Sequence, residues 1–198
     1  MRSNRAFTLI ELMIVISIIS VIIIIAIPSM IRARIAANET SALAACKALA
    51  TAENIYKRSD YDHDGVLEYA QFMSGDNSLL ESKAGANDLG MIDRSLAMSE
   101  GEPGVATGKN GYTFTILTSQ SAAAGTARGY LTCNIGGTLS SMVLGFGISA
   151  VPAGYDLTGR SSFIISETGT IYLRDRGTTG VQETQYDPDI AKHWAPAE

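Results

Sequence analysis

The sequence predicts an α+β protein, in which a long N-terminal helix packs on a small antiparallel β-sheet head. Three features predict this fold: an apolar run at the N-terminus, an alanine-rich stretch after it, and alternating apolar and polar residues in the second half. The first two features are typical of one helix that is half transmembrane and half stem. The 198 residues leave room for one modest globular domain beside that helix.

The composition excludes several classes of protein. Hydrophobic residues make up 46% of the chain, which is too many for a disordered protein. Asp and Glu number 20 against 15 Lys and Arg, and a net charge of −5 makes nucleic acid a poor partner. Two cysteines are too few for a disulfide scaffold or a four-cysteine zinc site.

The apolar run is long enough to cross a membrane. Leu12–Ile27 contains 16 residues without a charge, and extension back to Phe7 gives 21 residues with Glu11 as the single charge. A spanning helix needs about 20 residues. Arg2 and Arg5 precede the run, so we expect a cytoplasmic N-terminus and a head translocated outward. A secretory signal peptide fits less well, because its apolar region is shorter and ends at a cleavage site.

Glu11 is the anomaly of this segment. A carboxylate inside a membrane span costs a few kcal/mol on insertion scales, so such a residue is a functional candidate with a partner to be found. The alternative is that Glu11 lies near the edge of the span and simply reaches the interface.

The stretch from Ala6 to the residues after Pro28 resembles the N-terminus of type IV pilins and of the related pseudopilins of type II secretion. A short basic leader precedes the residues FTLIE, and an apolar helix follows. Counted from Phe7, Glu11 is the fifth residue and Pro28 the twenty-second, where the family has its glutamate and its helix-breaking proline. The sequence departs from the family at Ala6, where a glycine usually precedes the cleavage point.

The resemblance implies a structural subunit and a route of assembly. A prepilin peptidase would cut between Ala6 and Phe7 on the cytoplasmic face of the membrane and methylate the new amine. Inner-membrane assembly machinery would then build a homo-oligomeric helical filament, in which Glu11 of one subunit pairs with the amine of Phe7 on a neighbour. Such pairing is physically reasonable, because a buried carboxylate persists only when it is compensated.

We therefore divide the chain into four parts. They are the leader peptide 1–6, the transmembrane and assembly helix 7–29, the helical stem 30–58 and the head 59–198. Pro28 is expected to kink or locally melt the helix, because proline removes a backbone hydrogen bond and clashes with the preceding turn. The alanine-rich face of the stem is expected to receive the sheet of the head or a neighbouring helix closely.

An acidic loop follows the stem. Asp60, Asp62 and Asp64 alternate and Gly65 follows, as at the opening of a calcium-binding loop. Position twelve of such a loop is normally a bidentate glutamate and is Gln71 here. Two predictions stay open: a solvated turn, which Asp-Gly favours, or a calcium site. The ligands of that calcium site would be Asp60, Asp62, Asp64, Val66 and Glu68.

The head is predicted to contain three or four antiparallel strands packed on the C-terminal half of the stem. Strand patterns occupy 111–119, 127–134, 139–148, and a hairpin of 162–166 with 170–174. Short helical turns are possible at 78–83 and 93–98, and Trp194 is a candidate anchor for the C-terminal tail. Cys46 on the stem and Cys133 on a predicted strand are either joined by a disulfide, which an outward head permits, or are two buried thiols.

The sequence contains no Walker loop, GxGxxG, HExxH or GxSxG motif, and its two histidines lack partner spacing, so we predict no enzyme. A filament subunit is the main prediction, first in the inner membrane as a single-pass protein and later periplasmic or at the cell surface. The acidic loop and the lack of a C-terminal disulfide favour a secretion-type pseudopilin over a surface type IV pilin. A membrane-anchored periplasmic binding module is the alternative of another class, although a plain anchor has no need of Glu11.

Overall fold

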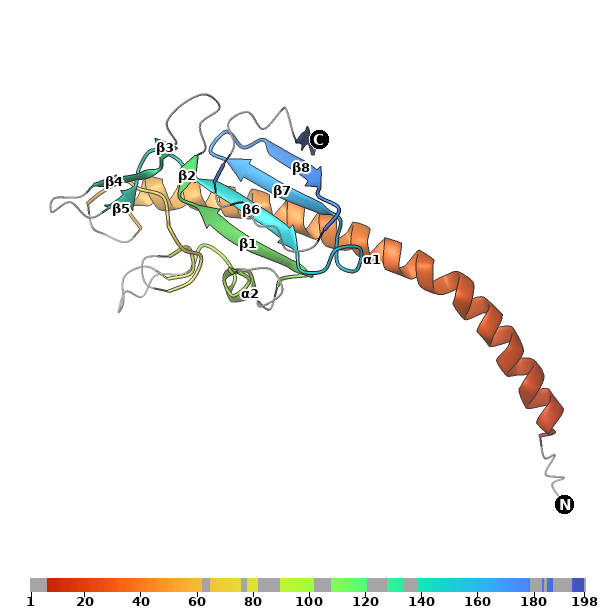
Figure 1. Cartoon of the computed structure of the whole chain (residues 1–198). Coiled ribbons are helices and arrows are strands. Elements are labelled where there is room, and N and C mark those ends of the chain that lie inside the picture. The colour runs from red at the N-terminus through yellow and green to blue at the C-terminus, as the bar shows by residue number, and fades with distance from the viewer. Residues whose placement is uncertain are drawn as a thin grey trace, which may run out of the picture.

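The computed structural model describes 7–61, 65–75, 78–81, 90–101, 108–120, 128–133, 139–178, 183, 185–186 and 194–197. These residues form a long helix, α1 (Leu9–Ser59), packed on a head with a five-stranded antiparallel sheet. Figure 1 shows the N-terminal half of α1 projecting far beyond the head. The predicted α+β fold class is confirmed.

Helix α1 is a single element of 51 residues with a defined cap at each end. Thr8 is its N-cap residue, and Asp60, in the left-handed conformation with φ 47°, ends it. Lys57 and Arg58 lie in the last turn, where positive charge favours the negative end of the helix dipole. At 1.5 Å per residue the helix is about 77 Å long.

The helix is not melted at Pro28, which corrects one of the two predicted outcomes. Pro28 lies inside α1, and the residues on both sides of it are helical. Figure 1 shows instead that the N-terminal half of α1 curves. Proline removes one backbone donor, and a bend relieves its clash with the preceding turn while the rest of the hydrogen-bond ladder continues.

Only the C-terminal part of α1 takes part in the core. Residues 7–34 are all exposed, and Ile35 is the first buried residue. The buried side chains of the helix are Ile35, Ala42, Cys46, Leu49, Ala50, Ala52, Glu53 and Tyr56. Three of these are alanines, whose small side chains allow the sheet to approach the helix, as predicted for the alanine-rich face.

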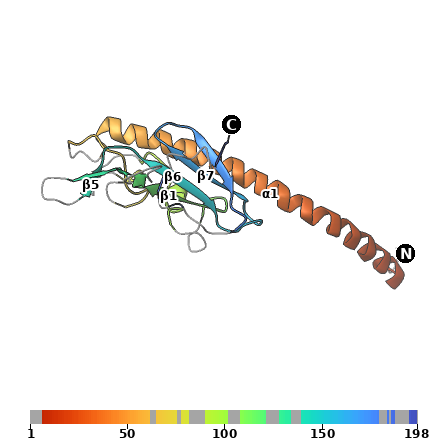
Figure 2. The same cartoon turned by 45° about the horizontal axis from the view of Figure 1, so that its top comes forward.

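The main sheet has the strand order β1-β6-β7-β8-β9, with every pair antiparallel. Its strands are β1 (Tyr112–Leu117), β6 (Gly147–Pro152), β7 (Ser161–Ser166), β8 (Ile171–Asp175) and β9 (Ala195–Pro196). Strands β6 and β7 contact α1, which runs along one face of the sheet (Figure 2). The sheet has five strands where three or four were predicted, because the C-terminal tail adds β9 at its edge. Two predicted strands are corrected: 139–148 contributes only the start of β6 to this sheet, and the described residues of 127–134 add no strand to it.

Trp194 anchors that tail, as predicted. Its side chain is buried, and the guanidinium of Arg176 lies 5.7 Å from the centre of its ring. Arg176 also forms an ion pair with Glu183, so one arginine holds two points of the tail against the end of β8.

Smaller elements complete the head. Strand β2 (Ser119–Gln120) pairs with β3 (Arg128–Gly129), and β4 (Leu131–Cys133) pairs with β5 (Leu139–Met142). Helix α2 (Arg94–Ala97), capped by the side chain of Asp93, confirms the helical turn predicted at 93–98. The helical turn predicted at 78–83 is wrong for 78–81, because 78–80 form bends and 81 has no regular structure; 82–83 lie outside the described residues.

Candidate assembly site

Thr8 and Glu11 form a closed capping box at the start of α1. The backbone N–H and the hydroxyl of Thr8 donate to Oε2 of Glu11 at 2.9 Å and 2.8 Å. In return, the backbone N–H of Glu11 donates to Oγ1 of Thr8 at 3.3 Å. The carboxylate of Glu11 is therefore held at the N-terminus of its own helix, where unpaired N–H groups and the helix dipole favour negative charge.

This geometry leaves one carboxylate oxygen for a partner. Among the residues that the structure describes, all hydrogen bonds to the Glu11 carboxylate reach Oε2, so Oε1 is available. Phe7, 85% exposed, directly precedes Thr8. Ala6, on the other side of the predicted cleavage point, lies outside the described residues.

The helix beyond this box presents an uncovered apolar surface. Of the described residues, only α1 is long and apolar enough to span a membrane, and its most apolar window is wholly unburied by the head. Ser17 and Ser20, the polar residues of the span, donate their hydroxyls to the carbonyls of Met13 and Ile16. An apolar surface of this length needs lipid or other helices to cover it.

Two families match the chain. The family described as "Protein of unknown function (DUF2950)" matches residues 26–196. The chain belongs to this family. The family described as "Prokaryotic N-terminal methylation motif" matches residues 1–27. No curated protein and no solved structure matches the chain.

The second match decides the general nature of the N-terminus. The methylation motif is the prepilin cleavage signal of type IV pilins and pseudopilins, as the residues around Phe7 and Glu11 predicted. It supports a type IV pilin-like or pseudopilin subunit, and the motif implies processing by prepilin peptidase. Together with the exposed apolar half of α1, it fits an anchor in the inner membrane.

The structure places part of the acidic loop. Asp60 is the C-cap residue of α1, and both its carboxylate oxygens accept the backbone N–H of Gly65 at 3.2 Å. Glu68 is buried and Val66 is half-buried. Asp62 and Asp64 lie outside the described residues, so the loop remains predicted either as a calcium site or as a turn.

Cys46 is a free thiol in the structure, so the alternative of a Cys46–Cys133 disulfide is not formed there. The side chain of Cys46 is fully buried in the core, and burial raises the pKa of its thiol to about 12. Cys133 ends strand β4, which pairs with β5 in a small sheet apart from the main one. The core position of Cys46, against the main sheet, explains why it acts as a small apolar residue.

Two carboxylates that the sequence did not single out hold the segment after the acidic loop. Glu53, 0% exposed on α1, accepts the backbone N–H of Ala70 at 2.9 Å. Glu100 accepts the backbone N–H groups of Met73 and Ser74 at 2.8 Å and 3.2 Å. A glutamate in a helical stem is normally at the surface, so nothing in the neighbouring sequence indicated that Glu53 is buried. The capping box, in contrast, is visible in the sequence as T-x-x-E.

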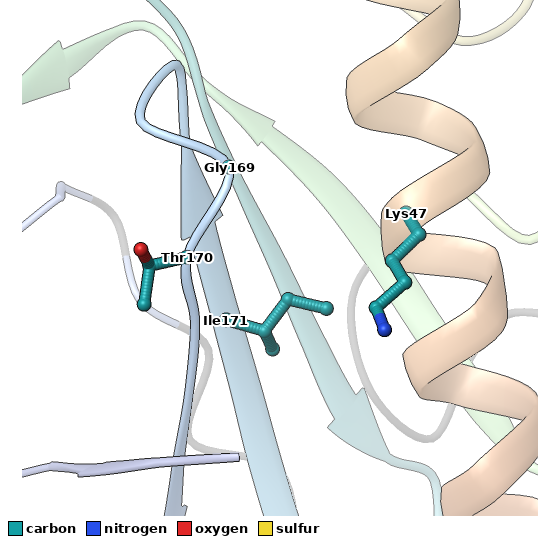
Figure 3. A pocket seen from close by; sticks show the side chains of 4 residues that line it. All are labelled: Lys47, Gly169, Thr170 and Ile171. Atoms are coloured by element: carbon teal, nitrogen blue, oxygen red, sulfur yellow. The ribbon is translucent and has the colours of Figure 1, made fainter. Parts of the chain in front are cut away.

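The hollow beside the β7–β8 turn is not lined by a group of acidic, histidine or cysteine side chains. One hollow of about 280 Å³ lies between α1 and the β7–β8 turn and is lined by Lys47, Gly169, Thr170 and Ile171 (Figure 3). Within the described ranges, no three His, Cys, Asp or Glu side chains are grouped as metal ligands. The residues with a defined functional arrangement are those at the start of α1.

Proposed function

We propose that this protein is a pseudopilin of a type II secretion-like system. Its inner-membrane assembly machinery would receive the subunit with the head outside the cytoplasm and add it to a homo-oligomeric helical filament. One observation carries the proposal: the carboxylate of Glu11 is held by Thr8, the residue after Phe7, at the capped start of an exposed apolar helix. A plain anchor needs the apolar surface but not the carboxylate.

The assembly step follows from charge. Cleavage after Ala6 gives Phe7 an ammonium group, whose positive charge would compensate the negative carboxylate of Glu11 on a neighbouring subunit. Oε1 of Glu11 can accept it while Oε2 stays in the capping box. In a lipid or helix-packed surrounding such a pair is far stronger than in water, and neither charge is tolerated there alone. Before cleavage the nitrogen of Phe7 is an uncharged peptide amide behind six leader residues, so the pair would form only after the leader is removed.

A secretion-type role is favoured over a surface pilus by two sequence features. The acidic loop at Asp60 follows the stem directly, and the chain has no cysteine beyond Cys133 that would form a C-terminal disulfide. A surface type IV pilin for adhesion or motility is the second candidate, since it shares the N-terminal signal.

The test combines N-terminal mass spectrometry with one substitution. We expect the mature chain in membrane fractions to begin at Phe7 with a methylated amine. Glu11→Ala should still insert, because it only raises hydrophobicity, but should yield few or no filaments. Ser17→Ala is the matched control: it also removes a polar group from the span, one bonded only to its own helix, and should leave filament yield unchanged.

A retained Met1, or normal filaments from Glu11→Ala, would contradict the proposal and favour a membrane-anchored binding module. Electron microscopy of sheared cell surfaces separates the two filament roles. Long surface filaments of this subunit in wild-type cells would favour the surface pilin, whereas loss of protein export on deletion would favour the pseudopilin.

A further inference from the structure

Residues 69–74 are held against the head without belonging to a strand or a helix. Figure 1 shows them in an irregular trace near the far end of α1. A single-residue bridge ties Tyr69 to Met142, whose carbonyl accepts the N–H of Tyr69 at 2.9 Å. Three more N–H groups of this segment donate instead to carboxylates: those of Ala70, Met73 and Ser74. The position of the segment therefore depends on side chains more than on a β-ladder.

Two glutamates from different elements hold the segment at its two ends. Oε2 of Glu53, on α1, accepts the N–H of Ala70 at 2.9 Å. Oε2 of Glu100, which lies just beyond α2, accepts the N–H groups of Met73 and Ser74 at 2.8 Å and 3.2 Å. The same oxygen accepts the hydroxyl of Ser74 at 3.4 Å. These contacts fix the segment between α1 and the residues that follow α2.

Glu53 is cut off from water and from positive charge. Its side chain is 0% exposed, and its Oε1 is buried without a hydrogen-bond partner among the described residues. Lys57, one turn further along α1, donates its ammonium group to the carbonyl of Val143 at 3.0 Å and lies 4.3 Å from the centre of the Tyr69 ring. None of the ion pairs between described residues includes Glu53. A buried carboxyl with so little compensation for a negative charge favours its neutral form.

The other titratable groups around this site do not reverse that preference. Burial raises the pKa of Glu53 well above 4.5; the N–H of Ala70 opposes the rise, and the negative charge of Glu100 adds to it. Burial also raises the pKa of Glu100 and that of Tyr69, so the tyrosine stays uncharged. Glu68, buried directly before the segment, is a further acid. Two more charged groups act on Tyr69 with opposite signs: Arg58 and Glu167.

Hydration of Glu53 requires the 69–74 segment to move away from α1. The helix itself is fixed in the core on both sides of Glu53, since Leu49 is 0% and Tyr56 1% exposed. The segment is the weaker side of the contact, because a single-residue bridge stands where the main sheet has ladders. Segments with few backbone bonds to the rest of a fold open locally before the whole protein unfolds. Such an opening would hydrate the carboxylate of Glu53 and uncover Met73, which is 0% exposed when the segment is closed.

We propose that Glu53 and Glu100 form an acid-closed latch on residues 69–74, which stays shut while Glu53 carries a proton and opens locally when Glu53 ionises. The closed state is fully favoured below the ordinary carboxyl pKa. Its advantage is lost as the pH rises through the raised pKa, because the open state releases the proton first. In that range one carboxyl increases the opening constant by up to about tenfold per pH unit. The latch uses neither the membrane anchor nor the filament, so it stands or fails apart from the proposed function.

The test is hydrogen–deuterium exchange of the full chain in detergent micelles between pH 5 and pH 7, read by mass spectrometry on fragments that cover 69–74 and β7. Protection factors correct each observed rate for the intrinsic effect of pH on amide exchange. We expect the protection of 69–74 to fall by roughly tenfold to a hundredfold over this range. At every pH it should lie at least about tenfold below the protection of β7, because β7 exchanges only when the whole head unfolds.

Three variants separate the latch from a general loosening of the head. Glu53→Gln cannot ionise and should make the protection of 69–74 nearly independent of pH, and Glu100→Gln should reduce the slope in part. Glu39→Gln is the matched control. Glu39 also lies on α1 and accepts two backbone N–H groups, those of Arg160 and Ser161, but it is only half-buried. This control should leave the pH response of 69–74 unchanged.

Three results would overturn the inference. Equal protection of 69–74 and β7 at every pH would show that the segment opens only with the whole head. A protection of 69–74 that does not change with pH in the wild type would show that no carboxyl controls the opening. A wild-type slope in both Glu53→Gln and Glu100→Gln would assign the pH response to other groups. The first two results need only the wild-type protein, so they decide the matter even if a variant does not fold.

Discussion

The buried carboxyl of Glu53 makes the stability of the head depend on pH. Its Oε2 accepts the N–H of Ala70, and its Oε1 is buried without a hydrogen-bond partner among the described residues. Burial raises the pKa of Glu53 well above the ordinary value of 4.5, and the negative charge of Glu100 adds to the rise. The folded head therefore favours the neutral form of Glu53.

The sign of the pH dependence follows. The folded state holds the proton of Glu53 more tightly than the unfolded state, so this contribution to stability is complete below the ordinary carboxyl pKa. It is lost as the pH rises through the raised pKa. Burial also raises the pKa of Glu100, so the second carboxyl acts in the same direction. The unfolding free energy of the wild type should decrease from pH 5 toward higher pH.

Two substitutions separate the charge of Glu53 from its hydrogen bond. Glu53→Gln keeps an acceptor for Ala70 and cannot ionise, so the pH slope should become shallower. Glu53→Leu leaves the N–H of Ala70, a residue only 1% exposed, without an acceptor. An unpaired buried donor costs about 1–3 kcal/mol, which is roughly 2–12 °C in Tm for a protein of this size.

The assay is thermal unfolding of the full chain in detergent micelles at pH 5 and pH 8, followed by near-ultraviolet circular dichroism of the head's aromatic residues. We expect Glu53→Gln to gain stability relative to wild type at pH 8 and to differ little at pH 5. Glu53→Leu should be less stable than wild type at pH 5. The reasoning is refuted if the Gln variant keeps the full pH slope, or if the Leu variant is as stable as wild type at pH 5.

Three further predictions follow from the helix start, the tail and the acidic loop. Thr8→Val removes the N-cap oxygen at a cost of about 1 kcal/mol and should lower filament yield without preventing membrane insertion; an unchanged yield would show that the capping box is dispensable. Trp194→Ala should destabilise the head by about 3–5 kcal/mol and expose the tail to limited proteolysis, and a tail cut no faster than in wild type would contradict this. For the acidic loop we expect the same calorimetric Tm in chelator and in millimolar calcium, since Gln71 lacks the bidentate carboxylate. A calcium-dependent rise in Tm that vanishes in Asp62→Ala with Asp64→Ala would instead establish a metal site.

The sequence by itself determined the features that depend on neighbouring residues. The apolar run and the alanine-rich stretch predicted one helix of nearly the observed bounds, and the hairpin of β7 and β8 followed from strand alternation around a glycine turn. The position of Glu11 within FTLIE predicted the methylation motif. These signals are readable because helix periodicity, capping and tight turns are set within a few residues along the chain.

Only the tertiary structure decided which of these residues are buried and what they hold. Glu53 pairs with an N–H 17 residues away, and Glu39 with an N–H 121 residues away. Cys46 became a core residue, and the tail supplied a fifth strand. Burial and long-range hydrogen bonds depend on which distant segments the fold brings to a helix face. The sequence pattern of that face is the same whether its glutamate contacts water or a backbone N–H.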